Sequence, residues 1–211
     1  MNRIMKLIDA SYEIITFTPE NDAHDICLGY TTCYKSAMPE TFEKQCEFIY
    51  KHRHHESQLE HSRLTVLFTI NRGVSHEIVR HRHCAFGQQS TRYCNYSKDR
   101  FNNELTFIRD CSIVKDKESY KAWLHGREMN EQEYFAQLKA GYKPEQARGC
   151  LPNDLATKLL VTTNYREWRY IFKLRCDTPA HYQMREVMIP LFKEVCDTLP
   201  CVFDDIHIKE D

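Results

Sequence analysis

The chain of 211 residues is long enough for one domain with a sizeable core and barely long enough for two. Its content of 42% hydrophobic and 12% aromatic residues argues against a disordered chain. The formal net charge of -1 provides no overall attraction to nucleic acid or to a membrane, so each basic cluster has to be judged locally. No apolar run approaches the roughly 20 residues that span a bilayer.

Ten cysteines are scattered singly along the chain, without a CxxC pair. The N-terminal sequence "MNRIMKLIDASYEIITF" alternates polar and apolar residues and contains acidic ones, which predicts a strand and not a secretory signal. Free thiols in a reducing compartment are therefore a better interpretation than disulfides, and we expect a cytoplasmic protein.

The first half of the chain predicts two helices and a strand between them. A helix is expected over residues 39–52, where apolar side chains recur at helical spacing and Pro39 suits a first turn. Residues 63–70, "RLTVLFTI", predict a strand that ends in the turn "NRG". Ser75 could then cap a short helix with the sequence "HEIVRHR", residues 76–82.

The second half predicts three helices and one strand. Residues 129–140 have a helical pattern that stops at Gly141, residues 155–163 predict a strand, and residues 165–175 predict a helix. The last helix carries the clearest apolar stripe, which we expect in the core: Met184, Val187, Met188, Leu191, Phe192 and Val195. Because strands and helices mix without strict alternation, the sequence predicts an α+β fold, as a single domain over residues 1–211.

Arg175 stands out at the end of the helix "YREWRYIFKLR". Trp168, Ile171 and Phe172 define the inward stripe of that helix, and the next position on the stripe is Arg175. A charged group on a buried face is costly unless it is paired, so Arg175 should meet an anion or a polarised carbonyl. The alternative is an arginine whose stem lies on the core while its head reaches water.

The stretch "RHRHCAFGQQSTRY", residues 80–93, gathers positive charge beside amides and hydroxyls. If residues 76–82 are helical, Glu77 and Arg80 share a face, whereas Arg80 and Arg82 point to nearly opposite sides. The loop that follows, closed by Arg92, suits an anionic or phosphorylated ligand, although it contains neither GxGxxG nor GxxxxGK[ST]. A solvated charged turn is the alternative.

Histidines invite a metal hypothesis, but their spacing does not support it. The candidates fit neither HExxH nor paired CxxC, and we expect no metal site from them: His52, His54, His55, His61, His81, His83 and Cys84.

Several blocks of the sequence resemble the flavin-dependent thymidylate synthases. Arg80-His81-Arg82, followed after seven residues by Ser90, is the signature of that family, and "STRYCNYSKDRF" continues as in many members. "HESQLEH", residues 55–61, resembles the family's "HETPFEH" at the expected distance before the Arg-His-Arg box. Residues 147–175 look like its second block, and "HYQMREVMIPLFKEV" like its closing helix. Several blocks at the right separations are far more specific than one short pattern.

The resemblance implies the thymidylate synthase-complementing fold, in which helices flank a mixed or antiparallel sheet. It also implies a homotetramer whose active sites are assembled from several subunits. The implied activity is the conversion of dUMP to dTMP, with carbon from 5,10-methylenetetrahydrofolate and reducing equivalents from NADPH through FAD. Because the family is regarded as working without a cysteine nucleophile, Cys84 and Cys94 need no catalytic role.

The resemblance further implies two sets of binding residues. Contacts to FAD are implied for Ser57, Arg80, His81, Arg82, Gln88, Asn164, Arg166 and Tyr170. Contacts to dUMP are implied for Glu77, Arg80, Gln88, Gln89, Ser90, Thr91, Arg92, Arg148 and Arg175, with the phosphate held by Ser90, Thr91, Arg92 and Arg148. Arg175 would be the catalytic residue at the pyrimidine ring. Methylation at C5 leaves negative charge on a ring carbonyl or N3, which a permanently charged guanidinium can stabilise.

The chain departs from the family pattern around the basic box. Ala85 replaces the usual Ser, Gly87 stands where Ser or Asn is common, and Gln89 replaces an acid of close relatives. Tyr170 occupies a position that is usually His or Asn. Loss of an acid beside the substrate could alter the nucleotide preference or the fate of the one-carbon unit.

Three rival functions remain open at this stage. A related enzyme on the same fold could act on another pyrimidine nucleotide or release a hydroxymethyl product. A nucleic-acid binder would need a broad basic surface and salt-sensitive binding, and a metal hydrolase would lose activity to chelators.

Overall fold

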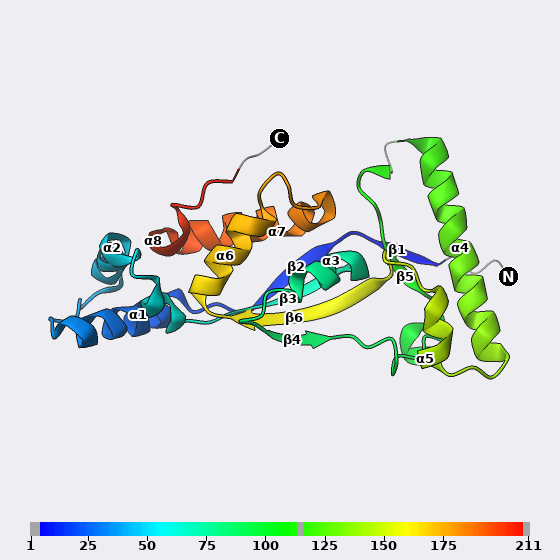
Figure 1. Ribbon diagram of the computed structural model, residues 1–211, viewed down its shortest axis with the longest axis horizontal. Helices are drawn as coiled ribbons and strands as arrows, with labels where there is room; N and C mark the ends of the chain where they lie inside the picture. Colours follow the sequence, from blue (N-terminus) through cyan, green and yellow to red (C-terminus); the bar gives the residue numbers. More distant parts are fainter. Residues whose placement is uncertain (1–4, 114–115, 209–211) are drawn as a thin grey trace. The chain divides into compact units, whose positions relative to one another are not determined.

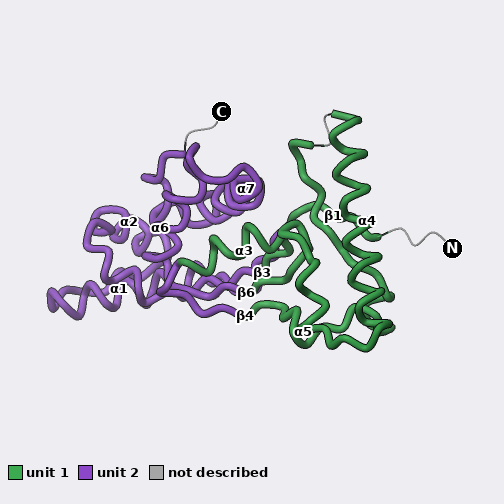
Figure 2. Tube along the Cα trace, turned by 45° about the vertical axis from the view of Figure 1, so that its right-hand side comes forward, with its two compact units in different colours: residues 1–11, 68–80, 87–159 green, residues 12–67, 81–86, 160–211 purple. Residues whose placement is uncertain are grey.

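Helices combine with two small sheets in the computed structural model, which describes residues 5–113 and 116–208 (Figure 1). The chain divides into two compact units (Figure 2). Unit 1 comprises residues 1–11, 68–80 and 87–159, and unit 2 comprises residues 12–67, 81–86 and 160–211. The single domain expected from the sequence stays a prediction. None of the helices in the described ranges is long and apolar enough to cross a membrane.

The strands form one pair and one four-stranded sheet. In the described part of the chain, β1 pairs with β5, and the other four strands lie in the order β2-β3-β6-β4. Their bounds are Lys6–Ile8 for β1, Ser11–Thr16 for β2, Leu64–Asn71 for β3, Ala85–Gln88 for β4, Thr106–Ile108 for β5 and Ala156–Thr163 for β6.

The strand directions are mixed. β1 and β5 are parallel, with Lys6 opposite Thr106. β3 and β6 are antiparallel, because the Thr65 hydroxyl lies 3.0 Å from that of Thr162 at one end while the Arg72 amide donates to the Leu155 carbonyl at the other. The predicted α+β class with a mixed or antiparallel sheet is therefore confirmed.

Unit 2 is built around two helices with continuous apolar faces. Trp168, Ile171 and Phe172 are fully buried on α6, as their spacing predicted, and all six stripe residues of the last helix are buried on α7. α6 packs against α7 and against η1, and α1 packs against α2 and η1. The bounds in this unit are Pro19–Tyr34 for α1, Phe42–His52 for α2, Glu56–Glu60 for η1, Tyr165–Arg175 for α6, Tyr182–Thr198 for α7 and Pro200–Phe203 for α8.

Unit 1 has its own hydrophobic core, in which Tyr96 and Tyr134 meet edge to face. The remaining buried members of this core are Met5, Leu105, Phe107, Ala147 and Leu155. The bounds in this unit are Arg72–Ile78 for α3, Asp99–Phe101 for η2, Lys117–Lys139 for α4, Pro144–Ala147 for α5 and Arg148–Cys150 for η4.

The predicted start of the helix at residues 76–82 is wrong. β3 runs directly into α3, because the side chain of Asn71 accepts a hydrogen bond of 2.7 Å from the Val74 amide and caps the helix. Ser75 is therefore inside the helix, where its hydroxyl donates to the Arg72 carbonyl. α3 ends at Ile78, so the arginines of the basic box lie in the turn that follows it.

Other boundaries also differ from the sequence prediction. α2 begins at Phe42 and is capped by Thr41, so Pro39 lies before the helix. α4 begins twelve residues earlier than the predicted helix of residues 129–140, and Gly141 follows its end with a φ of 94°, as a helix stop requires. The sequence pattern gave no prediction for α1, whose apolar residues are few and interrupted by polar ones.

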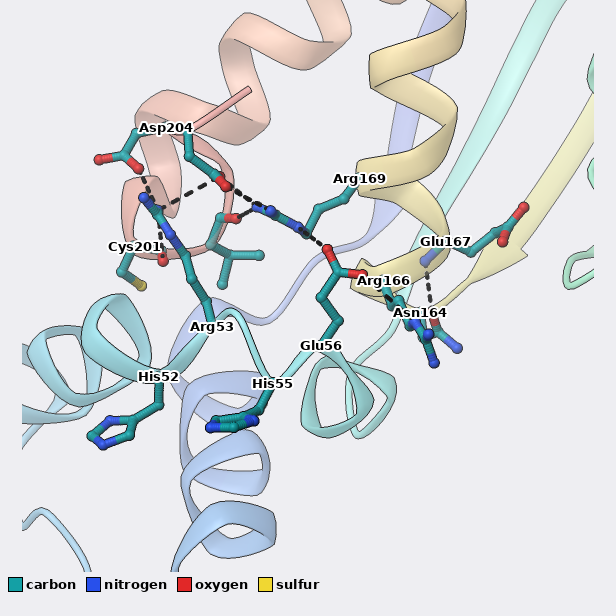
Figure 3. Close-up of polar contacts among 12 residues, drawn as sticks. His52, Arg53, His55, Glu56, Asn164, Arg166, Glu167, Arg169, Cys201 and Asp204 are labelled. Carbon is teal, nitrogen blue, oxygen red and sulfur yellow. Dashed lines mark hydrogen bonds and ion pairs between the residues drawn. The ribbon is translucent and has the colours of Figure 1, made fainter. Parts of the chain in front are cut away.

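A buried arginine ties α6 to the C-terminal part of unit 2 (Figure 3). Arg169 is 3% exposed, and its guanidinium binds the Asp205 carboxylate through two hydrogen bonds of 2.6 and 2.7 Å. It also donates to the Val202 carbonyl, and its Nε lies 3.6 Å from the carboxylate of Glu56 in η1. The cation holds the pKa of the Asp205 carboxyl below its usual value.

A second arginine joins the same network. Arg53 pairs with Asp204 and donates a hydrogen bond of 3.1 Å to the Cys201 carbonyl. The network therefore fixes η1, α6 and the segment after α8 to one another.

Arg169→Met should destabilise the protein strongly, because Asp205 and Glu56 would lose the cation that pairs them. Because these carboxylates are partly exposed and Arg53 still lies 3.7 Å from Asp205, we expect a loss of about 2–3 kcal/mol in the free energy of unfolding, measured by urea denaturation. Arg109→Met is the matched control, since Arg109 makes an exposed pair with Asp9 at 2.6 Å and should cost about 1 kcal/mol or less. An equal loss in the free energy of unfolding for the two variants would contradict a structural role for the buried network of Arg169.

Candidate active site

Arg175 meets His81 in unit 2, although 94 residues separate them in the chain. The Nε–H of Arg175 donates a hydrogen bond of 3.1 Å to Nε2 of His81. α6 places Arg175 in its last turn, where the residue is half-buried. Of the two alternatives that the sequence left open for Arg175, the structure shows a half-buried side chain with a hydrogen bond to an imidazole, which is neither the anion nor the carbonyl that was expected.

His81 is buried and uncharged near neutral pH. Its exposed fraction is 4%, and burial together with the positive charge of Arg175 lowers its pKa from 6.5 to about 4. Its second ring nitrogen, Nδ1, lies 3.4 Å from the carboxylate of Glu167. The ring of Tyr170 meets the imidazole edge to face, with 5.7 Å between the ring centres.

A cavity of about 520 Å³ lies beside this cluster, within unit 2. It is lined by Glu56, Glu60, His83, Asn164, Arg166, Glu167 and Tyr170, so it gathers three of the residues expected to contact FAD. Its size falls within the range of small-molecule sites. The exposed ring of Tyr170 provides an aromatic surface for a planar ligand.

Asn164 and Arg166 are both held in place at the start of α6 (Figure 3). The side-chain oxygen of Asn164 accepts a hydrogen bond of 2.9 Å from the Glu167 amide and caps the helix. Arg166 pairs with Glu60 at 2.6 Å and lies 3.8 Å from Glu56. The carboxylates of η1 therefore neutralise Arg166 and fix its direction.

The η1 segment, which carries Ser57 as an exposed side chain, packs closely on α1. A Cβ at Gly29 of α1 would lie 2.3 Å from the side-chain oxygen of Gln58, so a larger residue there would require the Gln58 side chain to move. A larger cavity of about 870 Å³ lies along the same two elements, but no predicted site residue lines it.

A second cluster lies in unit 1 and contains the residues expected to hold a phosphate. Thr91 is buried, and its hydroxyl accepts a hydrogen bond of 3.4 Å from the guanidinium of Arg148. Ser90 accepts a hydrogen bond of 3.2 Å from the Arg92 amide. Arg92 and Arg148 are both exposed, and Arg92 lies 4.0 Å from Glu145. Two guanidiniums, two hydroxyls and loop amides in one cluster are the groups that bind a phosphate.

The remaining predicted residues lie at several places. Gln88 donates a hydrogen bond of 2.7 Å to the Ser75 hydroxyl, whereas Gln89 lines a separate cavity of about 250 Å³ in unit 1. Gln88 is the last residue of β4 and Gln89 follows it, and consecutive side chains of an extended segment face opposite sides. Arg80 and Arg82 are exposed in the turn after α3, and Glu77 is half-buried on α3.

Sequence reasoning missed the acidic partners of the site. Glu167 lies beside His81, while Glu56 and Glu60 lie beside the arginines of α6. Glu167 follows the helix cap by three residues, which is a sequence pattern that predicts a capping role and no contact with His81. Within the described ranges no group of three or more His, Cys, Asp or Glu side chains is arranged to hold a metal ion.

Solved structures define the class of fold. A UMP/dUMP methylase, PolB from Streptomyces cacaoi bound with 5-Br dUMP, matches with a TM-score of 0.77 over 95% of this chain and 96% of that chain. The flavin-dependent thymidylate synthase ThyX from Helicobacter pylori, complexed with FAD and dUMP, matches with a TM-score of 0.75 over 94% of this chain and all of that chain. The identities are 17% and 19%, so these matches establish the fold.

The family model of the thymidylate synthase complementing proteins, Thy1, matches residues 13–201. The chain therefore belongs to this family, as the resemblance of its motifs predicted. A flavin-dependent thymidylate synthase of Pyrococcus abyssi is 38% identical over 144 residues, which cover 67% of this chain and 57% of the relative. A flavin-dependent thymidylate synthase of Corynebacterium aurimucosum is 30% identical over 164 residues, which cover 73% of this chain and 66% of that relative. The chain thus spans less than two thirds of these relatives.

The low pKa of His81 predicts a pH dependence of stability. Between about pH 4 and 6.5 the unfolded chain takes up a proton at residue 81 that the folded protein does not, so stability falls as the pH falls through this range. Over the whole range, the free energy of unfolding should fall by on the order of 3 kcal/mol. The free energy of unfolding is measured by urea denaturation at pH 4.5 and at pH 7. Its difference between the two pH values should be smaller in His81→Asn than in the wild type.

His125→Asn is the control for this measurement, because His125 is exposed on α4. An unchanged pH dependence in His81→Asn would show that residue 81 is not held uncharged in the folded protein.

Proposed function

We propose that the chain is a flavin-dependent thymidylate synthase that converts dUMP to dTMP. The carbon donor would be 5,10-methylenetetrahydrofolate, and reducing equivalents would come from NADPH through FAD. The observation that carries the proposal is the match to a flavin-dependent thymidylate synthase at 38% identity, within a family that covers residues 13–201. The two residue clusters described above support it with the chemistry that such a reaction needs.

Arg175 is proposed to act on the pyrimidine ring of dUMP. Methylation at C5 leaves negative charge on a ring carbonyl or on N3, and a guanidinium that is already in position can stabilise that charge without reorganisation. The uncharged imidazole of His81 supports this role, because it orients the guanidinium without cancelling its charge.

The phosphate of dUMP is proposed to bind the cluster of unit 1. Ser90, Thr91, Arg92 and Arg148 provide hydroxyls and guanidiniums for it. Glu77, Arg80, Gln88 and Gln89 complete the proposed dUMP site.

FAD is proposed to bind at the cavity of unit 2, and the residues there fit such a ligand. Tyr170 offers a flat ring, while the carboxylates of η1 and α6 can accept hydrogen bonds from sugar-like hydroxyl groups. Arg80 and Arg82 are exposed cations suited to a diphosphate. Bound FAD would supply hydride transfer, which no side chain of the protein can provide. The full proposed set is Ser57, Arg80, His81, Arg82, Gln88, Asn164, Arg166 and Tyr170.

The state of the cysteines supports a reaction without a protein thiolate. Burial raises the pKa of the Cys84 thiol, which lies in the basic stretch, to about 11. Burial also raises the pKa of six further thiols: Cys27, Cys46, Cys150, Cys176, Cys196 and Cys201. Because the thiolate is the nucleophilic form, these groups are poorly suited to attack the substrate.

The protein is further proposed to be a single domain in the cytoplasm that assembles as a homotetramer with shared active sites. Exposed apolar side chains are available for such an assembly: Ile15, Leu28, Tyr34 and Leu160.

Light scattering coupled to size exclusion should give a mass of about four chains of 25.2 kDa. A mass of one chain at micromolar concentration would contradict the shared sites.

A second candidate is a methylase of another pyrimidine nucleotide on the same fold. The match to PolB, which is described as a UMP/dUMP methylase, favours keeping this candidate. The replacement of an acid by Gln89 also removes a charge near the proposed dUMP site. Assays of product formation with dUMP and UMP in parallel separate the two candidates.

The proposed function predicts a yellow protein that makes dTMP. The purified protein should show bound flavin in its visible spectrum, bleach with NADPH, and form dTMP from labelled dUMP when methylenetetrahydrofolate is present. Arg175→Lys should keep the flavin and lower kcat roughly 100-fold or more, because a lysine cannot reproduce the geometry of the guanidinium. Unchanged turnover in Arg175→Lys would remove Arg175 from the reaction.

A further inference from the structure

Glu167, His81 and Arg175 form a row of side chains in unit 2. The Glu167 carboxylate lies 3.4 Å from Nδ1 of His81, and the Arg175 Nε–H donates to Nε2 at 3.1 Å. Glu167 and Arg175 are eight residues apart on α6, which corresponds to about 12 Å along the helix axis. The imidazole therefore bridges two side chains of one helix that are too far apart to touch.

The chemistry of this row fixes the position of the proton on His81. A guanidinium can only donate hydrogen bonds, so Nε2 of His81 must present a lone pair to Arg175. A neutral imidazole with an unprotonated Nε2 carries its proton on Nδ1, the nitrogen that faces the Glu167 carboxylate.

We propose that Glu167 is a positioning residue for Arg175. The carboxylate selects the tautomer of His81 with the proton on Nδ1, and this tautomer leaves Nε2 as the acceptor that directs the guanidinium. The inference rests on the proposed function, in which Arg175 acts on the pyrimidine ring. It extends that function to a residue that touches neither substrate nor reacting atoms in this role.

The opposite tautomer would break the row. A proton on Nε2 would face the Nε–H of Arg175, so two donors would meet and the hydrogen bond would be lost. Water cannot readily replace the missing partner, since only 3% of the His81 side chain is exposed. A catalytic group that is displaced by a fraction of an ångström loses much of its effect, so the tautomer should affect the rate.

The surroundings hold Glu167 and His81 in place. The Glu167 amide donates to the Asn164 side chain, which fixes the backbone that carries the carboxylate. The ring of Tyr170 packs edge to face on the imidazole and restricts its rotation. Glu167 also lines the cavity proposed for FAD, so a direct contact with the flavin is the competing explanation that the experiment must separate.

The experiment compares Glu167→Met, Glu167→Gln and Glu167→Asp with the wild type. Met removes both the charge and the acceptor, Gln keeps an oxygen that can accept the Nδ1 proton, and Asp is the conservative replacement. Glu47→Gln provides the matched control, because Glu47 is an exposed acid on α2. Each variant is measured for bound flavin, melting temperature, and kcat and KM for dUMP, and the tautomer of His81 is read from the nitrogen shifts of its imidazole by NMR.

We expect the wild-type imidazole to carry its proton on Nδ1. Glu167→Met should retain flavin and fold, move the proton to Nε2, and lower kcat roughly tenfold or more with a smaller effect on KM. Glu167→Gln and Glu167→Asp should lie between Met and the wild type in both the rate and the tautomer, and Glu47→Gln should match the wild type.

Three results would overturn the inference. The first is a wild-type imidazole with its proton on Nε2, and the second is an unchanged kcat in Glu167→Met. The third is a loss of flavin that parallels the loss of activity in every Glu167 variant, which would make Glu167 a flavin ligand. If the wild type makes no dTMP at all, the proposed function fails, and the positioning role of Glu167 in that reaction fails with it. The tautomer of His81 measured in the same protein then shows separately whether the row of Glu167, His81 and Arg175 exists.

Discussion

A permanently charged guanidinium held by a buried, uncharged imidazole is the interaction on which the candidate site depends. Burial and the charge of Arg175 keep His81 neutral, so His81 can accept a hydrogen bond without adding a second positive charge. The packing of α6 makes this contact possible, because Trp168, Ile171 and Phe172 bury one face of the helix and carry the stem of Arg175 to the same side.

The two arginines at positions 169 and 175 show how one helix can serve both stability and chemistry. Arg169 meets the Asp205 carboxylate in a bidentate pair, which satisfies its charge within the protein. Arg175 donates to the uncharged imidazole of His81, so this contact adds no negative charge beside its guanidinium. The network of Arg169 also reaches η1 through Glu56, and η1 in turn holds Arg166 beside the cavity proposed for FAD. The stability of unit 2 and the shape of that cavity are therefore coupled.

The sequence predicted those parts of the fold that depend on local periodicity. α6, α7 and β6 lie where their patterns placed them, because a continuous apolar stripe or a run of β-branched residues is sufficient to specify each. The start of α3 was missed because Asn71 is both the last residue of a strand and a helix cap, a dual role that no pattern of turn residues predicts. α1 was missed because it is held through contacts with distant segments, such as the hydrogen bond from Tyr165 to Asp22, and not by an apolar stripe of its own.

The site could be predicted only in part, for a related reason. The pattern of α6 placed Arg175 on the buried stripe but left open whether its head is paired or solvated, and the resemblance to a family supplied the ligand and the roles of the other residues. The contact with His81 joins positions 94 residues apart, so no spacing in the sequence could reveal it. Glu167 was missed for the same reason, since its contact with His81 depends on how the turn after α3 approaches α6.

A crystal structure of the protein with bound dUMP tests the central claim most directly. The account predicts that the terminal guanidinium nitrogens of Arg175 contact a carbonyl or N3 of the uracil ring while its Nε still donates to His81. A nucleotide bound with its ring away from Arg175, or an Arg175 that has left His81 to reach it, would contradict the account.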